Sequence, residues 1–139
     1  MPSSIFSIVN IAAMVMWFLL VFLPRWKVTK FLIQYKLIPI ALAIVYVIFI
    51  VQSLLAGVVL DFGSLNSVKT LFTNENLLLA GWIHYLVFDL LIGMWILDQN
   101  KNLGINNLFI ALCLIFTFML GPIGYLLFIL FKNIKTKQS

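Results

Sequence analysis

Four apolar stretches, each long enough to cross a lipid bilayer, constrain this chain more than any other feature. A hydrocarbon core of about 30 Å takes roughly 20 residues of α-helix. The stretches lie at residues 3–23, 37–60, 77–97 and 107–131. The sequence therefore predicts an all-α integral membrane bundle of four transmembrane helices, formed by a single domain over residues 1–139.

Composition excludes a water-soluble globule. Hydrophobic residues make up 64% of the chain and charged residues 9%, whereas about half and about a quarter are usual in soluble domains. The net charge of +5 is spread over the connections and the C-terminal tail, and it is not gathered in a basic run mixed with aromatic residues. Nucleic acid is therefore a poor partner, and membrane lipid with anionic headgroups is a better one.

The first apolar stretch begins almost at Met1, and its basic residues follow it. We find no basic segment before the stretch, no small-residue cleavage motif after it, and no transit peptide rich in Arg and Ser. We therefore expect a retained helix in an integral membrane protein of the bacterial cytoplasmic (inner) membrane.

The connections favour the membrane surface. PRWKVTKFLIQYK mixes aromatic with basic residues, which suits the interface plane, and DFGSLNSVKTLFTNEN has the apolar spacing of a short amphipathic turn or helix. With four full crossings, one side carries five basic residues, namely Arg25, Lys27, Lys30, Lys36 and Lys101, and the other carries four, namely Lys69, Lys132, Lys135 and Lys137. This near balance weakly favours a cytoplasmic first loop with both termini outside.

Each apolar stretch carries near its centre a polar residue, or a proline that leaves a backbone carbonyl without its helical hydrogen bond. Counting about 1.5 Å per residue places all of these residues within about 5 Å of the midplane. They are Asn10, Gln52, His84, Asp89, Thr117 and Pro122. Such a layer is typical of a pocket, and Asp89 is its most costly member because a charged carboxylate is strongly disfavoured at the centre of a membrane helix.

His84 and Asp89 are the candidate catalytic residues. Imidazole exchanges protons near neutral pH, and an ionisable residue inside a membrane is a functional candidate by default. Their sequence separation corresponds to about 140° around a helix. They can flank one pocket only if the third long helix is central and presents two faces. Trp82 and Tyr85 lie on the Asp89 side, whereas Asp98 is expected at the membrane boundary.

The motif GPIGY predicts a kinked fourth helix. Pro122 lacks an N–H and frees the carbonyl of Phe118, while Gly121 permits close packing. A free carbonyl is costly in lipid and should turn inward to a partner or a polar ligand. Tyr125, one turn away, is a candidate donor to it.

A cluster of motifs carries a family resemblance. The stretch LLLAGWIHYLVFDLLIGMWILDQNKNLGI, followed by a cysteine-bearing helix and GPIGYLL, resembles the abscisic-acid-deficient protein 4 family. Its members are small four-span proteins of plastids and bacteria, and the plant members are implicated in making neoxanthin from violaxanthin. The resemblance covers residues 72–128. It implies that the characteristic set here is Trp82, His84, Asp89, Asp98, Gly121 and Pro122.

The resemblance and the polar layer together favour a membrane isomerase acting on a carotenoid or similar lipophilic ligand. Converting an epoxide to an allenic alcohol requires one proton delivered to oxygen and another removed from carbon. Asp89 and His84 are the expected acid and base, in either order, with no metal and no cofactor. The expected substrate-binding residues are Asn10, Gln52, Trp82, Tyr85, Asp98, Thr117, Gly121, Pro122 and Tyr125.

Other hypotheses use the same residues differently. In a non-catalytic carotenoid- or lipid-binding subunit, or an assembly factor, the polar layer would hold helices together. A proton-coupled carrier would also need an intramembrane His and Asp, but four helices are few for a carrier unless the chain is a homo-oligomer. The chain lacks GxSxG and HExxH, its single histidine cannot form a multi-histidine metal cluster, and its single cysteine, Cys113, excludes an intrachain disulfide.

Overall fold

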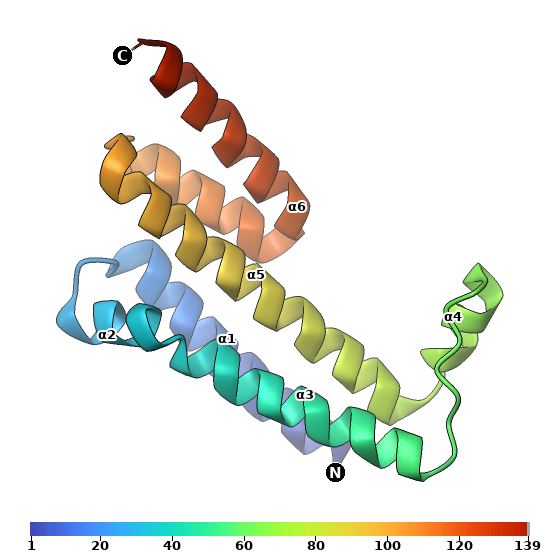
Figure 1. The fold of residues 1–139 in the computed structure, drawn as a ribbon. Coiled ribbons are helices and arrows are strands. Elements are labelled where there is room, and N and C mark those ends of the chain that lie inside the picture. The colour runs from blue at the N-terminus through green and yellow to red at the C-terminus, as the bar shows by residue number, and fades with distance from the viewer. Residues whose placement is uncertain (139) are drawn as a thin grey trace.

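The computed structural model describes residues 1–138, and all of their regular secondary structure is α-helical (Figure 1). Four long apolar helices are accompanied by two short ones. In chain order the helices are α1 (Pro2–Phe22), α2 (Lys27–Tyr35), α3 (Leu37–Leu55), α4 (Leu65–Leu71), α5 (Glu75–Leu103) and α6 (Asn107–Gln138). The all-α prediction and the prediction of four long apolar helices are therefore confirmed.

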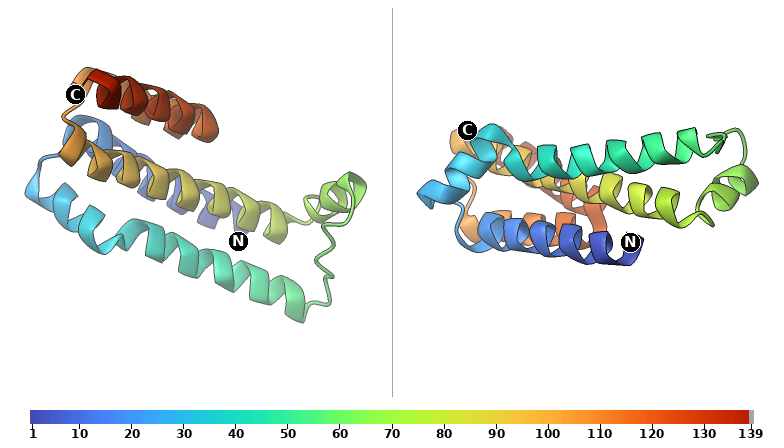
Figure 2. Two further views of the ribbon diagram at one scale, coloured as in Figure 1. Left: turned by 45° about the horizontal axis from the view of Figure 1, so that its top comes forward. Right: turned by 90° about the horizontal axis from the view of Figure 1, so that it is seen from below.

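Helix α5 lies at the centre of the bundle and packs against α1, α3 and α6 (Figure 2). Of the most apolar 18-residue segment of α5, 56% is buried, whereas 33% or less of the corresponding segment is buried in each of the other three long helices. A helix with three neighbours presents different residues to each of them. A pocket shared by His84 and Asp89 would require the third long helix to be central. This requirement is met by α5.

Local signals set the ends of α5. The side-chain oxygen of Asn74 accepts hydrogen bonds from two backbone N–H groups of the first turn, which caps the start. Gly104, with φ 61°, ends the helix in the left-handed conformation that glycine adopts readily. The side chain of Asn100 then makes two hydrogen bonds to the backbone of Ile105, of 2.7 and 3.0 Å. The connection from α5 to α6 is therefore short and well defined.

The ends of α3 and the short helices differ in part from the expected pattern. Helix α3 stops at Leu55, earlier than the expected residue 60, and Gly57 in the following turn has φ 84°. The amphipathic segment of the first connection forms α2, and part of the second connection forms α4. The N–H of Ser67 donates a hydrogen bond to the hydroxyl oxygen of Ser64, which caps the start of α4. Both short helices lie where the sequence placed surface segments.

Helix α6 is broken at two residues near its middle. Leu120 has φ −142° and ψ 46°, and Gly121 has φ 1° and ψ −75°, which are not helical values. Pro122 follows immediately and provides no N–H for a helical hydrogen bond. The predicted interruption of the fourth long helix is therefore confirmed at the expected motif.

Beyond the break the chain folds back on itself (Figure 1). Gly124 lies against the backbone of Thr117, and the rings of Phe109 and Phe131 are 5.1 Å apart. A straight helix would hold those two rings about 33 Å apart. The two halves of α6, residues 107–119 and 122–138, are therefore the arms of a helical hairpin, and the bend is sharper than the kink that the sequence predicts.

The hairpin brings the C-terminal tail to the end of the bundle that holds α2, and the N-terminus lies at the opposite end (Figures 1 and 2). Lys135 of the tail accordingly lines one cavity together with Arg25 and Lys36. We call this end the basic end; its cations are Arg25, Lys27, Lys30, Lys36, Lys101, Lys132, Lys135 and Lys137. Only Lys69 among the basic residues lies at the other end. The prediction that both termini lie on one side is therefore wrong, because the N- and C-termini lie at opposite ends of the bundle.

Candidate functional site

Asp89 is a buried acidic side chain in the middle of the bundle, with an exposed fraction of 8%. It lies on the face of α5 that meets α6, and its Oδ2 atom has no hydrogen-bond partner among the described residues. A buried polar atom without a partner costs free energy, and a charged one costs more. This oxygen is therefore well suited to bind a polar group of a ligand.

Gly121 creates the space that the Asp89 carboxyl occupies. A Cβ atom added at Gly121 would lie 2.5 Å from Asp89 Oδ1 and 3.3 Å from its Cγ. The glycine therefore allows the backbone of the break to approach the carboxyl directly. In this way the break in α6 and the carboxyl in α5 form one structural unit.

Tyr85 completes this unit from one turn before Asp89. Its hydroxyl donates to the backbone carbonyl of Met119 at 3.3 Å, lies 3.5 Å from that of Phe118, and also interacts with the Asp89 carboxyl. Both carbonyls lie just before the break, and the missing N–H of Pro122 leaves an acceptor free there. We call these groups, namely Asp89, Tyr85, Gly121 and the carbonyls of Phe118 and Met119, the polar break site.

The donor to the freed carbonyl differs from the expected one. Tyr125 lies beyond the reversal, where its ring packs against Trp95 with a centroid distance of 5.7 Å. Because the chain turns back at Gly121, Tyr125 is carried toward the C-terminal half of α5 and not toward Phe118. Tyr85 therefore has the role that the sequence analysis expected for Tyr125.

Helix α1 closes another side of the site. The indole N–H of Trp82 donates to Asn10 Oδ1 at 2.7 Å and links α5 to α1. The ring of Trp17 lies against Gly93, where an added Cβ would meet it at 2.8 Å, and 5.5 Å from the ring of Phe118. Trp17 was not among the residues predicted from the sequence, and the small residue Gly93 in α5 is the signal that could have identified it.

His84 lies on a different face of α5 and does not meet Asp89. Its ring is exposed and lies 5.9 Å from the ring of Tyr46 in α3 and 4.8 Å from that of Phe88. Asp89 faces Gly121 of α6 instead. Helix α5 is central, but its two faces serve two separate environments, so the structure does not bring the two candidate catalytic residues together.

The remaining candidates lie outside the polar break site or have their hydrogen bonds satisfied. Thr117 is buried, and its hydroxyl donates to the carbonyl of Cys113 at 2.7 Å within α6. Gln52 is exposed on α3. Asp98 forms an exposed ion pair with Lys101 at 2.9 Å at the basic end of the bundle, away from Asp89. No group of three His, Cys, Asp or Glu side chains among residues 1–138 is arranged as metal ligands.

The polar break site combines a carboxyl, a phenol hydroxyl and backbone carbonyls within an apolar bundle. A carboxyl accepts hydrogen bonds when charged and also donates one when protonated. Such a group can bind an epoxide, hydroxyl or carbonyl oxygen of a lipophilic molecule, and it can give or take a proton. Leu120 and Met119 at the break are half exposed or more, so the site lies directly beneath the outer surface of the bundle.

The four long apolar helices define the chain as an α-helical integral membrane protein, and the unpaired Asp89 oxygen lies inside its bundle. Within that class, the family model described as ABA DEFICIENT 4-like matches residues 4–128, and the chain belongs to this family. The match confirms the resemblance found in the sequence and extends it over the first two long helices. No curated protein and no solved structure matches the chain.

Proposed function

We propose that this protein binds a carotenoid or a similar isoprenoid lipid within the membrane and isomerises it by proton transfer, as a neoxanthin synthase would. Membership of the ABA DEFICIENT 4-like family supports a carotenoid-related role. The observation that carries the chemical part is the buried Asp89 carboxyl, whose Oδ2 has no partner beside the break in α6.

One carboxyl is sufficient for the proton balance of this reaction. A protonated Asp89 gives its proton to the epoxide oxygen as the ring C–O bond opens. The resulting carboxylate then takes a proton from the neighbouring chain carbon, whose C–H electrons form the new double bond of the allene. The product has the same formula as the substrate, and Asp89 is protonated again.

Tyr85 is the positioning residue in this scheme. Its hydroxyl is held by the carbonyls of Phe118 and Met119 and lies next to Asp89. It can therefore orient the carboxyl and the substrate oxygen without itself exchanging a proton. His84 lies outside this arrangement, and we assign it to the surface that contacts α3 and lipid.

A second function is favoured by the separation of His84 from Asp89. His84 and Asp89 face different neighbours, so they do not form the acid–base pair expected of an enzyme. A non-catalytic subunit needs no such pair, and it could bind a carotenoid through the polar break site alone. In this alternative, Asp89 and Tyr85 hold a hydroxyl or epoxide oxygen of the pigment, and no bond is broken.

The two functions are separated by incubating the purified protein, reconstituted in lipid, with violaxanthin. The isomerase proposal expects a product of unchanged mass and altered chromatographic retention, formed by the wild type and absent with Asp89→Asn. Retention of unchanged pigment by the wild type, lost in Asp89→Asn, would support the binding subunit. A protein that neither binds nor converts the pigment would contradict both.

A further inference from the structure

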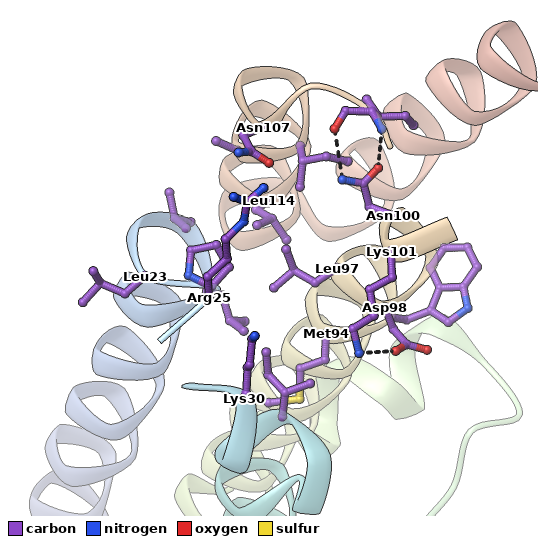
Figure 3. Close-up of a pocket in the computed structure, with 18 of the residues that line it drawn as sticks. Leu23, Arg25, Lys30, Met94, Leu97, Asp98, Asn100, Lys101, Asn107 and Leu114 are labelled. Carbon is purple, nitrogen blue, oxygen red and sulfur yellow. Dashed lines mark hydrogen bonds and ion pairs between the residues drawn. The ribbon is translucent and has the colours of Figure 1, made fainter. Parts of the chain in front are cut away.

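A large cavity opens at the basic end of the bundle, and its lining in α5 begins at Leu91 and includes no residue of the polar break site (Figure 3). Its volume is about 1600 Å³, and its walls come from the end of α1, the first connection, the C-terminal part of α5 and the start of α6. Small-molecule sites usually measure about 300 to 1,000 Å³, so this cavity has room for a large amphiphile.

Positive charge dominates the cavity wall. The cations that line it are Arg25, Lys30, Lys36, Lys101 and Lys135, and Asp98 is the one acidic residue that lines it. Asp98 is already paired with Lys101 at 2.9 Å. No carboxylate among residues 1–138 forms a salt bridge with the other four cations, so the cavity has a strong excess of positive charge.

The polar groups face the cavity from several directions. In Figure 3 the side chains of Arg25 and Lys30 extend into the space between the first connection and the α5–α6 corner. Asn107 at the first turn of α6 lies on the opposite wall, where the N-terminal end of the helix adds partial positive charge. Several elements, and not one helix end alone, therefore present donors to the same volume.

The inner wall of the cavity is apolar. Met94 and Leu97 of α5 and Leu114 of α6 line it (Figure 3), together with Leu20 of α1. A cationic rim above an apolar wall at the end of membrane-spanning helices matches an amphiphile whose anionic head lies at the interface and whose chain lies deeper. A free anion would leave the apolar wall without a partner.

We propose that this cavity binds an anionic phospholipid, with the headgroup phosphate held by Arg25 and Lys30 and an acyl chain along the apolar wall. Guanidinium and ammonium groups form strong charge-assisted hydrogen bonds to phosphate oxygens, which a zwitterionic headgroup reduces through its own cation. This site is independent of the proposed isomerisation, because none of its residues belongs to the polar break site.

The test uses native mass spectrometry of the delipidated full chain in neutral detergent, titrated with phosphatidylglycerol or phosphatidylcholine of identical acyl chains. The wild type should bind phosphatidylglycerol about tenfold more tightly or better. The double variant Arg25→Gln/Lys30→Gln should lose this preference. The charge-matched control Lys27→Gln/Lys69→Gln should keep it, because neither of those lysines lines the cavity.

Three outcomes would overturn the proposal. Equal binding of both lipids by the wild type would show that the cationic rim does not select headgroups, and this comparison remains decisive if the double variant fails to fold. An equal loss of preference in both double variants would show a dependence on net charge alone. Inorganic phosphate that displaces the lipid at equal concentration would identify a site for free anions.

Discussion

The carboxyl of Asp89 in α5 lies against the backbone of Gly121 in α6, so closely that a Cβ atom at Gly121 would come within 2.5 Å of Asp89 Oδ1. The acidic group of the central helix and the reversal of the last helix therefore depend on each other. A change that straightens α6 would remove the wall of the site, and a larger residue at position 121 would displace the carboxyl.

The close packing of the two arms of α6 depends on the absence of a side chain at Gly124. A Cβ at Gly124 would collide with the backbone of Thr117, which cannot move as a flexible side-chain end can. We expect Gly124→Ala to lower the free energy of unfolding by about 1 to 3 kcal/mol, the usual cost of overpacking. Thermal unfolding in detergent measures this, with the half-exposed Ile123→Ala as control. Equal stability of Gly124→Ala and wild type would contradict the close approach of the arms.

The hydrogen bond from Trp82 to Asn10 should contribute measurably to the packing of α1 on α5. A double-mutant cycle with Asn10→Ala and Trp82→Phe is expected to give a coupling free energy of about 0.6 kcal/mol, typical for such bonds in membrane proteins. Gln52→Ala, on an exposed position of α3, should have little effect on stability. Additive effects of the two substitutions in the cycle would show that the bond does not form.

Much of the fold was predictable because it depends on local properties. The length of the apolar stretches fixes the four long helices, and mixed aromatic and basic composition identifies α2 as a surface segment. The reversal at Gly121 was not predictable to the same degree, because a proline in a membrane helix most often produces only a bend. Whether the arms lie side by side depends on contacts such as Gly124 with Thr117, which are distant in a straight helix.

The same limit applies to the site. The estimate of depth placed Asp89 and Pro122 in one layer around the midplane, and the structure places the carboxyl at the break. Sequence spacing also gave the angle between His84 and Asp89, but which neighbour each residue faces depends on the packing of α3 and α6. Tyr125 was a reasonable donor in a continuous helix, and the reversal moved it to Trp95.

The hairpin predicts the orientation of the chain. Eight of the nine basic residues lie at the basic end, so by the positive-inside rule we expect this end to face the cytoplasmic side. In a Cys113→Ser background, single cysteines at Lys27 and Thr136 should react with an impermeant thiol reagent only from that side. A cysteine at Ser67 in α4 should react only from the other. Labelling of positions 136 and 67 from the same side would contradict the hairpin and favour a full fourth crossing.

The most direct test of the central claim, that Asp89 assisted by Tyr85 performs the proton transfer, compares violaxanthin conversion by three variants reconstituted at equal folded amounts. Asp89→Asn should reduce the rate by about a hundredfold or more, because general acid–base groups contribute on that scale. Tyr85→Phe should reduce the rate by a smaller factor, and His84→Ala should leave it close to that of the wild type. Full conversion by Asp89→Asn, or a loss confined to His84→Ala, would contradict the account.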